Sequence, residues 1–421
     1  MTIMTIKKIK ISNFKSFRDL EIELGKFNVL IGANASGKSN FIQIFKFLKD
    51  ITNHGFDNAI SMQGGVEYLR NINIGSLENF LLEVVLDLKY WRLIGRTKEK
   101  GQLGMNVYEM IYKFDIKFRK PGRGFEIIED KITQKFDIVR LEVKKEKIEE
   151  REKIGQGEIA ISNVKGKIKL DSLKLPEGIP IKEEDIFPPF FKGYRLGLRT
   201  SLIDRLNPTF FLAPPIFSNI AIYNFDPKLP KKATPITGKA EIEEDGSNLA
   251  IVLKNIIENK DKKRKLTNLV KDILPFVEDL DVEKFADSSL LFKLREIYAK
   301  NQYLPASLIS DGTINITALI IALYFEKKQL TIIEEPERNI HSYLNSKVVE
   351  MMKDVLQEKQ IIVTTHNPEI LKHAGLENIL LVSRDKEGFS VVSRPHEKET
   401  VKTFLRNDLG IEELYVQNLL E

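Results

Sequence analysis

The sequence contains no cysteine, which excludes disulfide bonds, cysteine metal ligands and thiol chemistry and suits a reducing cytosol. Its first residues, MTIMTIKKIKI, lack the apolar core of a signal peptide. The most apolar stretch, ALIIALYF at 318–325, is far shorter than the roughly 20 residues of a membrane span. These absences predict a soluble, cytoplasmic protein without a membrane partner.

An excess of charge of one sign is also missing. The 421 residues contain 65 Lys and Arg against 60 Asp and Glu, and the net charge of +5 is too small to argue for nucleic acid or a membrane by itself. One basic run, KKRK at 262–265, fits either a DNA contact or a solvated helix face, which is the more common case. With 42% hydrophobic residues the chain can bury a large core, and its length suggests two or three lobes.

The hydrophobic pattern predicts a strand, a loop and a helix near the N-terminus, because the apolar run FNVLI at 27–31 precedes helical spacing from Gly37. Apolar residues then recur at every second position over 108–118 and resume after the turn PGRG, which indicates antiparallel strands. Residues 135–200 are charged and irregular, and we expect an insertion there. The late segments LTIIEEPE, QIIVTTHNP and ILLVSR alternate with helices, which favours a mostly parallel sheet covered on both faces.

Nine residues, GANASGKSN at 32–40, match the phosphate-binding pattern G-x-x-x-x-G-K-[ST]. Gly32 and Gly37 let the backbone curl so that its N–H groups and the helix N-terminus face phosphates, where a side chain would block the approach. Lys38 would reach the β- and γ-phosphates, and the Ser39 hydroxyl would bind Mg²⁺. The alternative is a glycine turn with a surface lysine, but the flanking strand and helix favour a nucleotide site.

Acidic and basic side chains follow two later strands. Glu334 and Glu335 end the apolar strand of LTIIEEPE, where one carboxylate would serve Mg²⁺ and the next would orient an attacking water. His366 ends the strand of QIIVTTHNP, where an imidazole would reach a γ-phosphate or serve a structural role. In LISDGTINI, Ser310 and the Gly312 backbone begin an expected helix, which is either a second phosphate-facing N-terminus or an ordinary cap.

The order NFKSF, GANASGKSN, SDGT, IIEEPE and THNP resembles the ABC-type ATPases of the RecF/SMC class, and most closely the ATPase part of the OLD family and its small prokaryotic, antiphage-defence-type relatives. The resemblance extends over residues 1–90 and 205–395. It implies an α/β P-loop NTPase fold: an ABC-ATPase head with an N-terminal antiparallel β lobe and an inserted β and helical region. The expected segments are 1–91 with Walker A and the Q-loop region, 92–205 as the insertion, and 206–421 with the helical lobe, signature, Walker B and H-loop.

The same resemblance assigns roles to residues near the two later strands. It makes Glu334 the Walker B acid that binds Mg²⁺ and Glu335 the catalytic glutamate. It also makes His366 the H-loop histidine, with a catalytic role, and places His341 in the D-loop. ATP and Mg²⁺ are therefore the expected cofactors.

A degenerate signature, Ser310, Asp311 and Gly312, would contact the nucleotide of a second subunit in trans. Lys15 would touch a phosphate and Gln63, in MQGG, would be the Q-loop residue, although either is as well explained as a solvated surface residue. The predicted nucleotide-binding residues are Lys15, Gly32, Asn34, Ser36, Gly37, Lys38, Ser39, Asn40 and Gln63.

Several departures from the family pattern narrow the function. Asp311 stands where ABC transporters usually have glycine, Glu334 replaces the common aspartate, and Ser342 follows His341 where relatives often have proline, which argues against a transport subunit. No long heptad pattern is present, so an SMC-like tether is not expected. The residues after His366 contain no D-x-D cluster, so we expect any nuclease to be another chain.

The resemblance thus implies a slow, ATP-hydrolysing switch that dimerises head to head around ATP, as a homodimer or a higher assembly. The leading hypothesis is an antiphage-defence or DNA-associated ATPase that holds or licenses a separately encoded effector, such as a nuclease or toxin. The alternative is a RecF-like repair clamp that binds DNA directly. A transport subunit is the third and least favoured class.

Overall fold

The computed structural model describes residues 3–97, 101–119, 124–144, 147–178, 182–187, 189, 193–205, 216–285, 288–300, 302–406 and 409–420. The chain divides into two compact units, each assembled from segments that are distant in the sequence. The first unit comprises Met1–Gly25, Asn34–Ile220 and Ser383–Val392, and the second comprises Lys26–Ala33, Ala221–Val382 and Ser393–Glu421. The expected segment boundaries at residues 92 and 205 remain a prediction.

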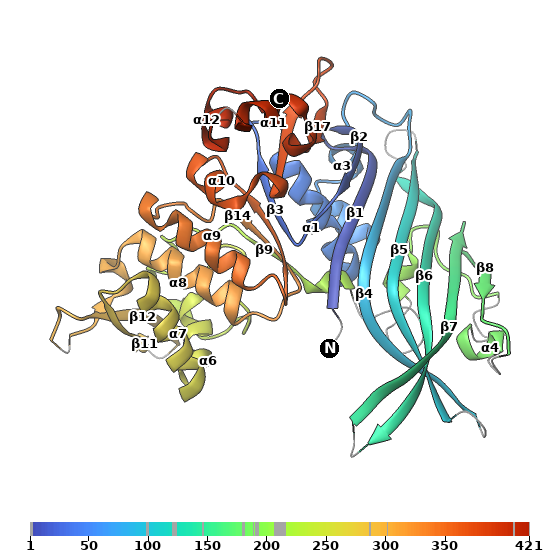
Figure 1. Cartoon of the computed structure of the whole chain (residues 1–421), viewed down its shortest axis with the longest axis horizontal. Helices are drawn as coiled ribbons and strands as arrows, with labels where there is room; N and C mark the ends of the chain where they lie inside the picture. Colours follow the sequence, from blue (N-terminus) through green and yellow to red (C-terminus); the bar gives the residue numbers. More distant parts are fainter. Residues whose placement is uncertain are drawn as a thin grey trace. The chain divides into compact units, whose positions relative to one another are not determined.

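The first unit contains a seven-stranded antiparallel sheet with the strand order β2-β1-β4-β5-β6-β7-β8. Figure 1 shows its long strands β4 to β7 side by side. Alternate residues face the core in the first half of β4, where Phe80, Leu82, Val84 and Leu86 are buried. The strands are β1 (Ile3–Phe14), β2 (Phe17–Glu23), β4 (Phe80–Thr97), β5 (Gly101–Phe118), β6 (Phe125–Lys144), β7 (Lys147–Val164) and β8 (Lys167–Lys174).

The sheet corrects the expectation of an irregular stretch over 135–200, because β6, β7 and β8 continue as regular strands to Lys174. The charged residues there form pairs across the strands, with the Nζ–carboxylate distance 2.8 Å for Lys135 and Glu109 and 2.8 Å for Lys153 and Asp137. Opposite charges on facing positions stabilise a sheet as apolar pairs do. The high content of Lys and Glu therefore suggested an irregular segment, although apolar residues recur there at the two-residue period of a strand.

Helix α1 (Lys38–His54) packs its apolar side against this sheet. The Phe47 ring lies 5.8 Å from Phe80, 6.3 Å from Phe114 and 6.4 Å from Phe14, measured between centroids. Aromatic pairs of this kind add about 0.5–1.5 kcal/mol beyond the burial of their area. The other helices of the first unit are α2 (Phe56–Met62), α3 (Val66–Leu69), α4 (Glu183–Ile186), α5 (Leu202–Arg205) and the 3₁₀ helix η2 (Ile216–Asn219).

A six-stranded sheet with the order β17-β16-β3-β15-β14-β9 forms the centre of the α/β part. The pairs β14–β15, β15–β3 and β16–β3 are parallel, which agrees with the expectation from the late apolar segments. Strands β3 and β15 are buried along their whole length. The strands are β3 (Phe27–Ile31), β9 (Ile220–Tyr223), β14 (Leu330–Glu334), β15 (Gln360–Thr364), β16 (Ile379–Arg384) and β17 (Ser390–Ser393).

Helices and a small sheet complete the second unit and share one cluster of buried apolar side chains with β3, β14 and β15. The helices are α6 (Leu249–Ile257), α7 (Lys260–Ile273), α8 (Asp311–Tyr324), α9 (Asn345–Asp354), α10 (Pro368–Ala374), α11 (Glu399–Arg406) and α12 (Ile411–Val416), with 3₁₀ helices η3 (Ala306–Leu308), η4 (Ser342–Leu344), η5 (Leu376–Asn378) and η6 (Pro395–Glu397). The small sheet contains β10 (Thr234–Pro235), β11 (Val277–Phe285), β12 (Ser289–Glu296) and β13 (Leu304–Pro305). In the part of the chain that the structure describes, no helix is both long and apolar enough to cross a membrane.

Candidate nucleotide site

Three parallel strands bring the ends of the predicted motifs to one edge of the central sheet. Thr364 in β15 pairs with Leu30 in β3 on one side and with Glu334 in β14 on the other. The phosphate loop begins at Gly32, just beyond β3, and His366 follows just beyond β15. In parallel α/β sheets ligands bind at the carboxyl ends of the strands, so this edge is where a nucleotide site is expected.

The phosphate loop has backbone angles that suit glycine. Gly37 has φ +120°, and a Cβ built there would lie 2.9 Å from the Cβ of Ser390 and 3.0 Å from the Ser16 hydroxyl. Ala35 adopts the left-handed region with φ +61°. Helix α1 follows without a side-chain cap and without an acidic residue in its first turn. The positive end of the helix dipole therefore meets no acidic side chain of this turn, which fits the phosphates of a nucleotide.

Two side chains from the end of β16 and the start of β17 hold the carbonyl groups of this loop. Arg384 donates from Nε (3.1 Å) and Nη2 (2.9 Å) to the Ala35 carbonyl, and it donates to the Gly388 carbonyl at 2.7 Å. The Ser390 hydroxyl donates to the Ser36 carbonyl at 2.6 Å. Because these bonds engage the carbonyl oxygens, they turn the loop's N–H groups toward the other side, where phosphates would bind.

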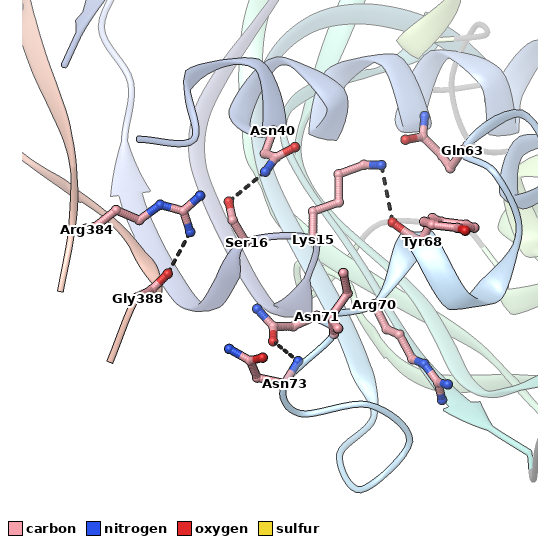
Figure 2. A pocket seen from close by; sticks show the side chains of 11 residues that line it. Lys15, Ser16, Asn40, Gln63, Tyr68, Arg70, Asn71, Asn73, Arg384 and Gly388 are labelled. Atoms are coloured by element: carbon pink, nitrogen blue, oxygen red, sulfur yellow. Dashed lines mark hydrogen bonds between the residues drawn. The ribbon is translucent and has the colours of Figure 1, made fainter. Parts of the chain in front are cut away.

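A cavity of about 610 Å³ in the first unit adjoins the start of α1. It brings together three residues of the predicted site: Lys15 from the turn between β1 and β2, Asn40 from α1, and Gln63 directly after α2 (Figure 2). Its remaining lining residues are Ser16, Tyr68, Arg70, Asn71, Ile72, Asn73, Arg384 and Gly388. A mixed lining of polar and apolar groups around a volume of this size is typical of small-molecule sites.

Two polar side chains in the cavity, Lys15 and Gln63, have hydrogen-bonding capacity that the described residues do not fully use. The Lys15 Nζ donates only a long bond, 3.3 Å, to the Tyr68 carbonyl, and burial lowers the pKa of this amine. Asn40 donates to the Ser16 hydroxyl at 2.8 Å (Figure 2). Gln63 is only 7% exposed, and its Oε1 atom has no hydrogen-bond partner among the described residues. A buried amide oxygen without a partner is costly, so a bound ligand or ion would relieve it.

The segment that carries Arg70 and Asn71 was not predicted from the sequence as part of the site. Asn71 is buried, and its N–H donates to the side chain of Asn13 at 3.0 Å. Asn13 in turn donates to the Gly75 carbonyl at 3.1 Å, so the segment is held against β1. A signal was present, because an arginine and two asparagines follow Gly64 and Gly65 within a few residues, but their approach to Lys15 depends on the tertiary structure.

The acidic residues after β14 occupy different environments. Glu334 ends the strand, whereas Glu335 has a left-handed backbone with φ +46° and accepts hydrogen bonds from Arg338. Glu337, which the sequence analysis did not select, accepts a bond from the Thr365 hydroxyl at 2.5 Å, and burial raises the pKa of its carboxyl group. His366 is half-buried beside Thr365. The edge therefore offers three half-buried acidic groups, of which Glu335 and Glu337 have different hydrogen-bond partners.

The predicted signature begins helix α8. Ser310 is exposed and caps the helix by accepting from the Thr313 N–H at 3.2 Å. Asp311 forms an ion pair with Lys231 at 2.5 Å. A Cβ on Gly312 would lie 2.6 Å from the Asn339 carbonyl oxygen, so only glycine allows this close packing. Ser310 thus acts as an ordinary helix cap within its own chain, and its contact with the nucleotide of a second subunit stays a prediction.

His341, the expected D-loop residue, is exposed, and its ring centroid lies 4.9 Å from that of Tyr343. Among the described residues no group of three or more His, Cys, Asp and Glu side chains forms a metal site. A Mg²⁺ ion held by one hydroxyl, one carboxylate and nucleotide phosphates needs no such group. The exposed Ser39 hydroxyl and the Glu334 carboxylate are suitable donors of that kind.

Comparisons with known proteins agree with this geometry. Residues 4–183 match the family model described as "AAA ATPase domain", and residues 214–372 match the one described as "AAA domain, putative AbiEii toxin, Type IV TA system". A search of curated proteins finds no match.

Among solved structures, the Smc head domain with an extended coiled coil, bound to the C-terminal domain of ScpA from Pyrococcus furiosus, is 14% identical and aligns over 96% of this chain and 100% of that chain with a TM-score of 0.50. An SmcHead bound to the C-winged helix domain of ScpA is 16% identical over 92% and 97%, with a TM-score of 0.49. The SMC head domain from Thermotoga maritima is 14% identical over 92% and 98%, with a TM-score of 0.41.

The fold expectation is therefore confirmed: the chain has a P-loop α/β core with an antiparallel sheet, as in an ABC-type ATPase head. Both family models describe AAA domains, and one of them names an ATPase domain outright. Taken together, the two family matches support ATPase activity in general, and the structural match supports the fold.

Proposed function

We propose that this protein is a slow ATP-hydrolysing switch in which two heads close around ATP and Mg²⁺. The observation that supports it most is the edge at which β3, β14 and β15 end. The phosphate loop follows β3, Glu334 and Glu335 lie at the end of β14, and His366 follows β15. A glycine loop alone is compatible with many nucleotide-binding proteins. An acid pair at the end of β14, which β15 separates from β3 in the same sheet, adds the groups that hydrolysis needs.

In this proposal each residue has one task. Lys38 neutralises the β- and γ-phosphates, while Ser39 and Glu334 hold Mg²⁺, which supplies charge stabilisation when bound. Glu335 orients and activates the attacking water as a general base, and His366 donates a hydrogen bond to the γ-phosphate. Lys15, Asn34, Ser36, Asn40 and Gln63 complete the nucleotide-binding set.

Dimerisation is proposed from the surface around α8. Ser310 is exposed at the start of this helix, and the side chain of Leu308, two residues before it, is 70% exposed. Large apolar side chains beside an exposed polar helix start are typical of protein contact surfaces. We assign this surface to a second copy of the chain, in which Ser310 and the Gly312 N–H would contact the partner's γ-phosphate.

The biological role proposed for the switch is in antiphage defence or in association with DNA, where it holds or licenses a separate nuclease or toxin in the cytoplasm. The resemblance to the OLD family supports this role, and so does the match over 214–372 to a model whose description names a toxin–antitoxin system. A RecF-like DNA clamp is the alternative. In the basic run, Lys263 pairs with Asp279 at 3.1 Å and Arg264 with Asp261 at 3.3 Å, which favours a solvated helix face.

The test is nucleotide-dependent self-association of Glu335→Gln, measured by sedimentation velocity with and without ATP and Mg²⁺. The glutamine keeps the size of the side chain but loses the charge that activates water, so ATP binding should survive while hydrolysis stops. We expect the variant to accumulate as an ATP-dependent dimer, or as a more closed form of an existing dimer detected by limited proteolysis.

Two further variants separate the parts of this proposal. Lys38→Ala should lose ATP binding in a nucleotide titration, because it removes a charge that contacts the phosphates. When Ser310→Arg is added to Glu335→Gln, ATP should no longer cause dimerisation, although ATP should still bind to the phosphate loop with the same affinity. Wild-type affinity in Lys38→Ala would overturn the phosphate-loop assignment, and an unchanged ATP response in the double variant would overturn the contact in trans.

A further inference from the structure

The carboxylate of Glu335 is held by a neighbouring arginine. Arg338 donates from Nη2 (2.7 Å) and Nε (3.2 Å) to the same atom, Oε2 of Glu335. The Arg338 N–H also donates to the Glu335 carbonyl at 2.9 Å, and Glu335 has a left-handed backbone with φ +46°. Because two N–H groups of one guanidinium share Oε2, the lone pairs of that oxygen are engaged by the arginine rather than by water.

Arg338 is itself tied to two other segments of the second unit. Its Nη1 donates to the side chain of Asn224, directly after β9, at 3.2 Å. Its carbonyl accepts from Nδ2 of Asn315 at 2.7 Å, and Asn315 is buried in α8. The first turn of α8 also packs against the following residue, since Gly312 leaves no room for a Cβ beside the Asn339 carbonyl. Helix α8 and the Glu335 carboxylate are therefore connected through Arg338.

We propose that Arg338 is a positioning residue that restrains Glu335 and makes its release depend on the position of α8. This inference rests on the proposed function, because it concerns the residue assigned to activate water. Oε2 must give up the two guanidinium bonds before it accepts a proton from water, and while they persist they also fix the direction of the other carboxylate oxygen. A shift of α8, which begins at Ser310, moves Asn315 and with it the arginine backbone, so contact at the surface of α8 releases the carboxylate.

The test compares steady-state ATP hydrolysis by the full chain and by the variant Arg338→Ala. Removing the guanidinium should raise kcat by roughly two- to five-fold, which corresponds to the interaction free energy of an exposed ion pair. KM and the ATP dissociation constant should stay unchanged. Arg338→Lys keeps the charge but lacks the planar guanidinium, so its kcat should lie between those of wild type and Arg338→Ala. A purely structural role for Arg338 would lower the melting temperature without raising kcat.

Coupling to α8 is measured with Asn315→Ala, which should raise kcat less than Arg338→Ala does and add nothing when the two are combined. Arg264→Ala is the matched control, because it also removes an arginine–carboxylate pair three residues apart, on α7, and should leave the rate at the wild-type value. If kcat of Arg338→Ala is equal to or below that of active wild type, Arg338 does not restrain Glu335. If the effects of Arg338→Ala and Asn315→Ala on kcat are strictly additive, Arg338 is not coupled to α8. If wild type hydrolyses no ATP and Lys38→Ala binds it equally well, the proposed function fails, and this inference fails with it.

Discussion

Gly37 is the residue of the phosphate loop that leaves least room for a side chain. Its φ of +120° disfavours any L-residue, and a methyl group would overlap the Ser390 side chain, which is bonded to the Ser36 carbonyl. We expect Gly37→Ala to lower the free energy of unfolding by roughly 2–5 kcal/mol, as the sum of backbone strain and overpacking, and to abolish ATP binding. Urea unfolding and a nucleotide titration measure the two effects.

The matched control is Gly65→Ala. Gly65 has a similar left-handed backbone, with φ +90°, but no atom lies within 4 Å of the Cβ position. Its substitution should cost only the strain, roughly 1–2 kcal/mol, and should leave ATP affinity unchanged. Equal losses of stability in the two variants would show that crowding by Ser390 is unimportant.

At the scale of elements, Lys359 links the end of α8 to the start of β15. This lysine is 5% exposed, and its Nζ donates to the carbonyl oxygens of Ala322 at 3.0 Å and Glu326 at 2.5 Å. The last carbonyl groups of a helix need such donors. The buried amine thus connects the helix that begins at Ser310 to the strand that leads to His366.

The buried lysine predicts a pH dependence of stability. Burial lowers the pKa of Lys359 from 10.5 to about 8, partly opposed by the Glu326 carboxylate, while Lys265 acts in the same direction as burial. Between about pH 8 and pH 10.5 the unfolded chain therefore binds more protons at this site than the folded protein does. Stability contributed by this group should rise with pH across that window, by roughly 3 kcal/mol at most.

The measurement is urea unfolding of wild type and Lys359→Met at several values from pH 8 to pH 10.5. Methionine has a similar length but no proton to lose, so the variant should lack this increase with pH. Because all other titrating groups are shared, the difference between the two curves isolates Lys359. Parallel curves over the whole window would mean that the amine titrates at its ordinary pKa.

At the scale of the whole molecule, the two proposed roles differ in their response to DNA. A clamp that contacts the phosphates of a duplex should bind less tightly as salt rises, in proportion to the phosphates neutralised, and duplex should change its ATPase rate. For an effector-holding switch we expect neither salt-dependent binding of duplex DNA nor stimulation of hydrolysis. Fluorescence anisotropy with a labelled duplex at low and high salt, beside an ATPase assay, measures both.

Charge reversal of the basic run is the control for this experiment. Lys262 and Arg264 are exposed on α7, and changing both to Glu should leave DNA binding and ATPase rate unaffected if the run is a solvated helix face. Salt-dependent binding that the double variant loses would instead establish direct DNA contact through α7. The DNA clamp would then replace the effector-holding role.

Much of the nucleotide site could be predicted because its signals are local. Glycines at 32 and 37 specify a loop whatever surrounds them, and an apolar strand that ends in Glu334 and Glu335 places acids at a sheet edge. The alternation over 108–118 likewise predicted the strand that became β5. In each case the residues that determine the structure lie within a few positions of one another.

Other features were decided by contacts between distant segments. The regular strands over 135–174 depend on cross-strand partners such as Glu109, which a local reading of charge does not reveal. Arg384 reaches the Ala35 carbonyl across 349 residues of sequence. By itself the sequence determined the fold class, because glycine conformation and strand periodicity are short-range properties, and the residues that it assigns to phosphate and Mg²⁺ stay a prediction. Only the tertiary structure decided that Arg338, which holds Glu335, is itself held by α8, because the hydrogen bond from Asn315 requires chain packing to bring its partners together.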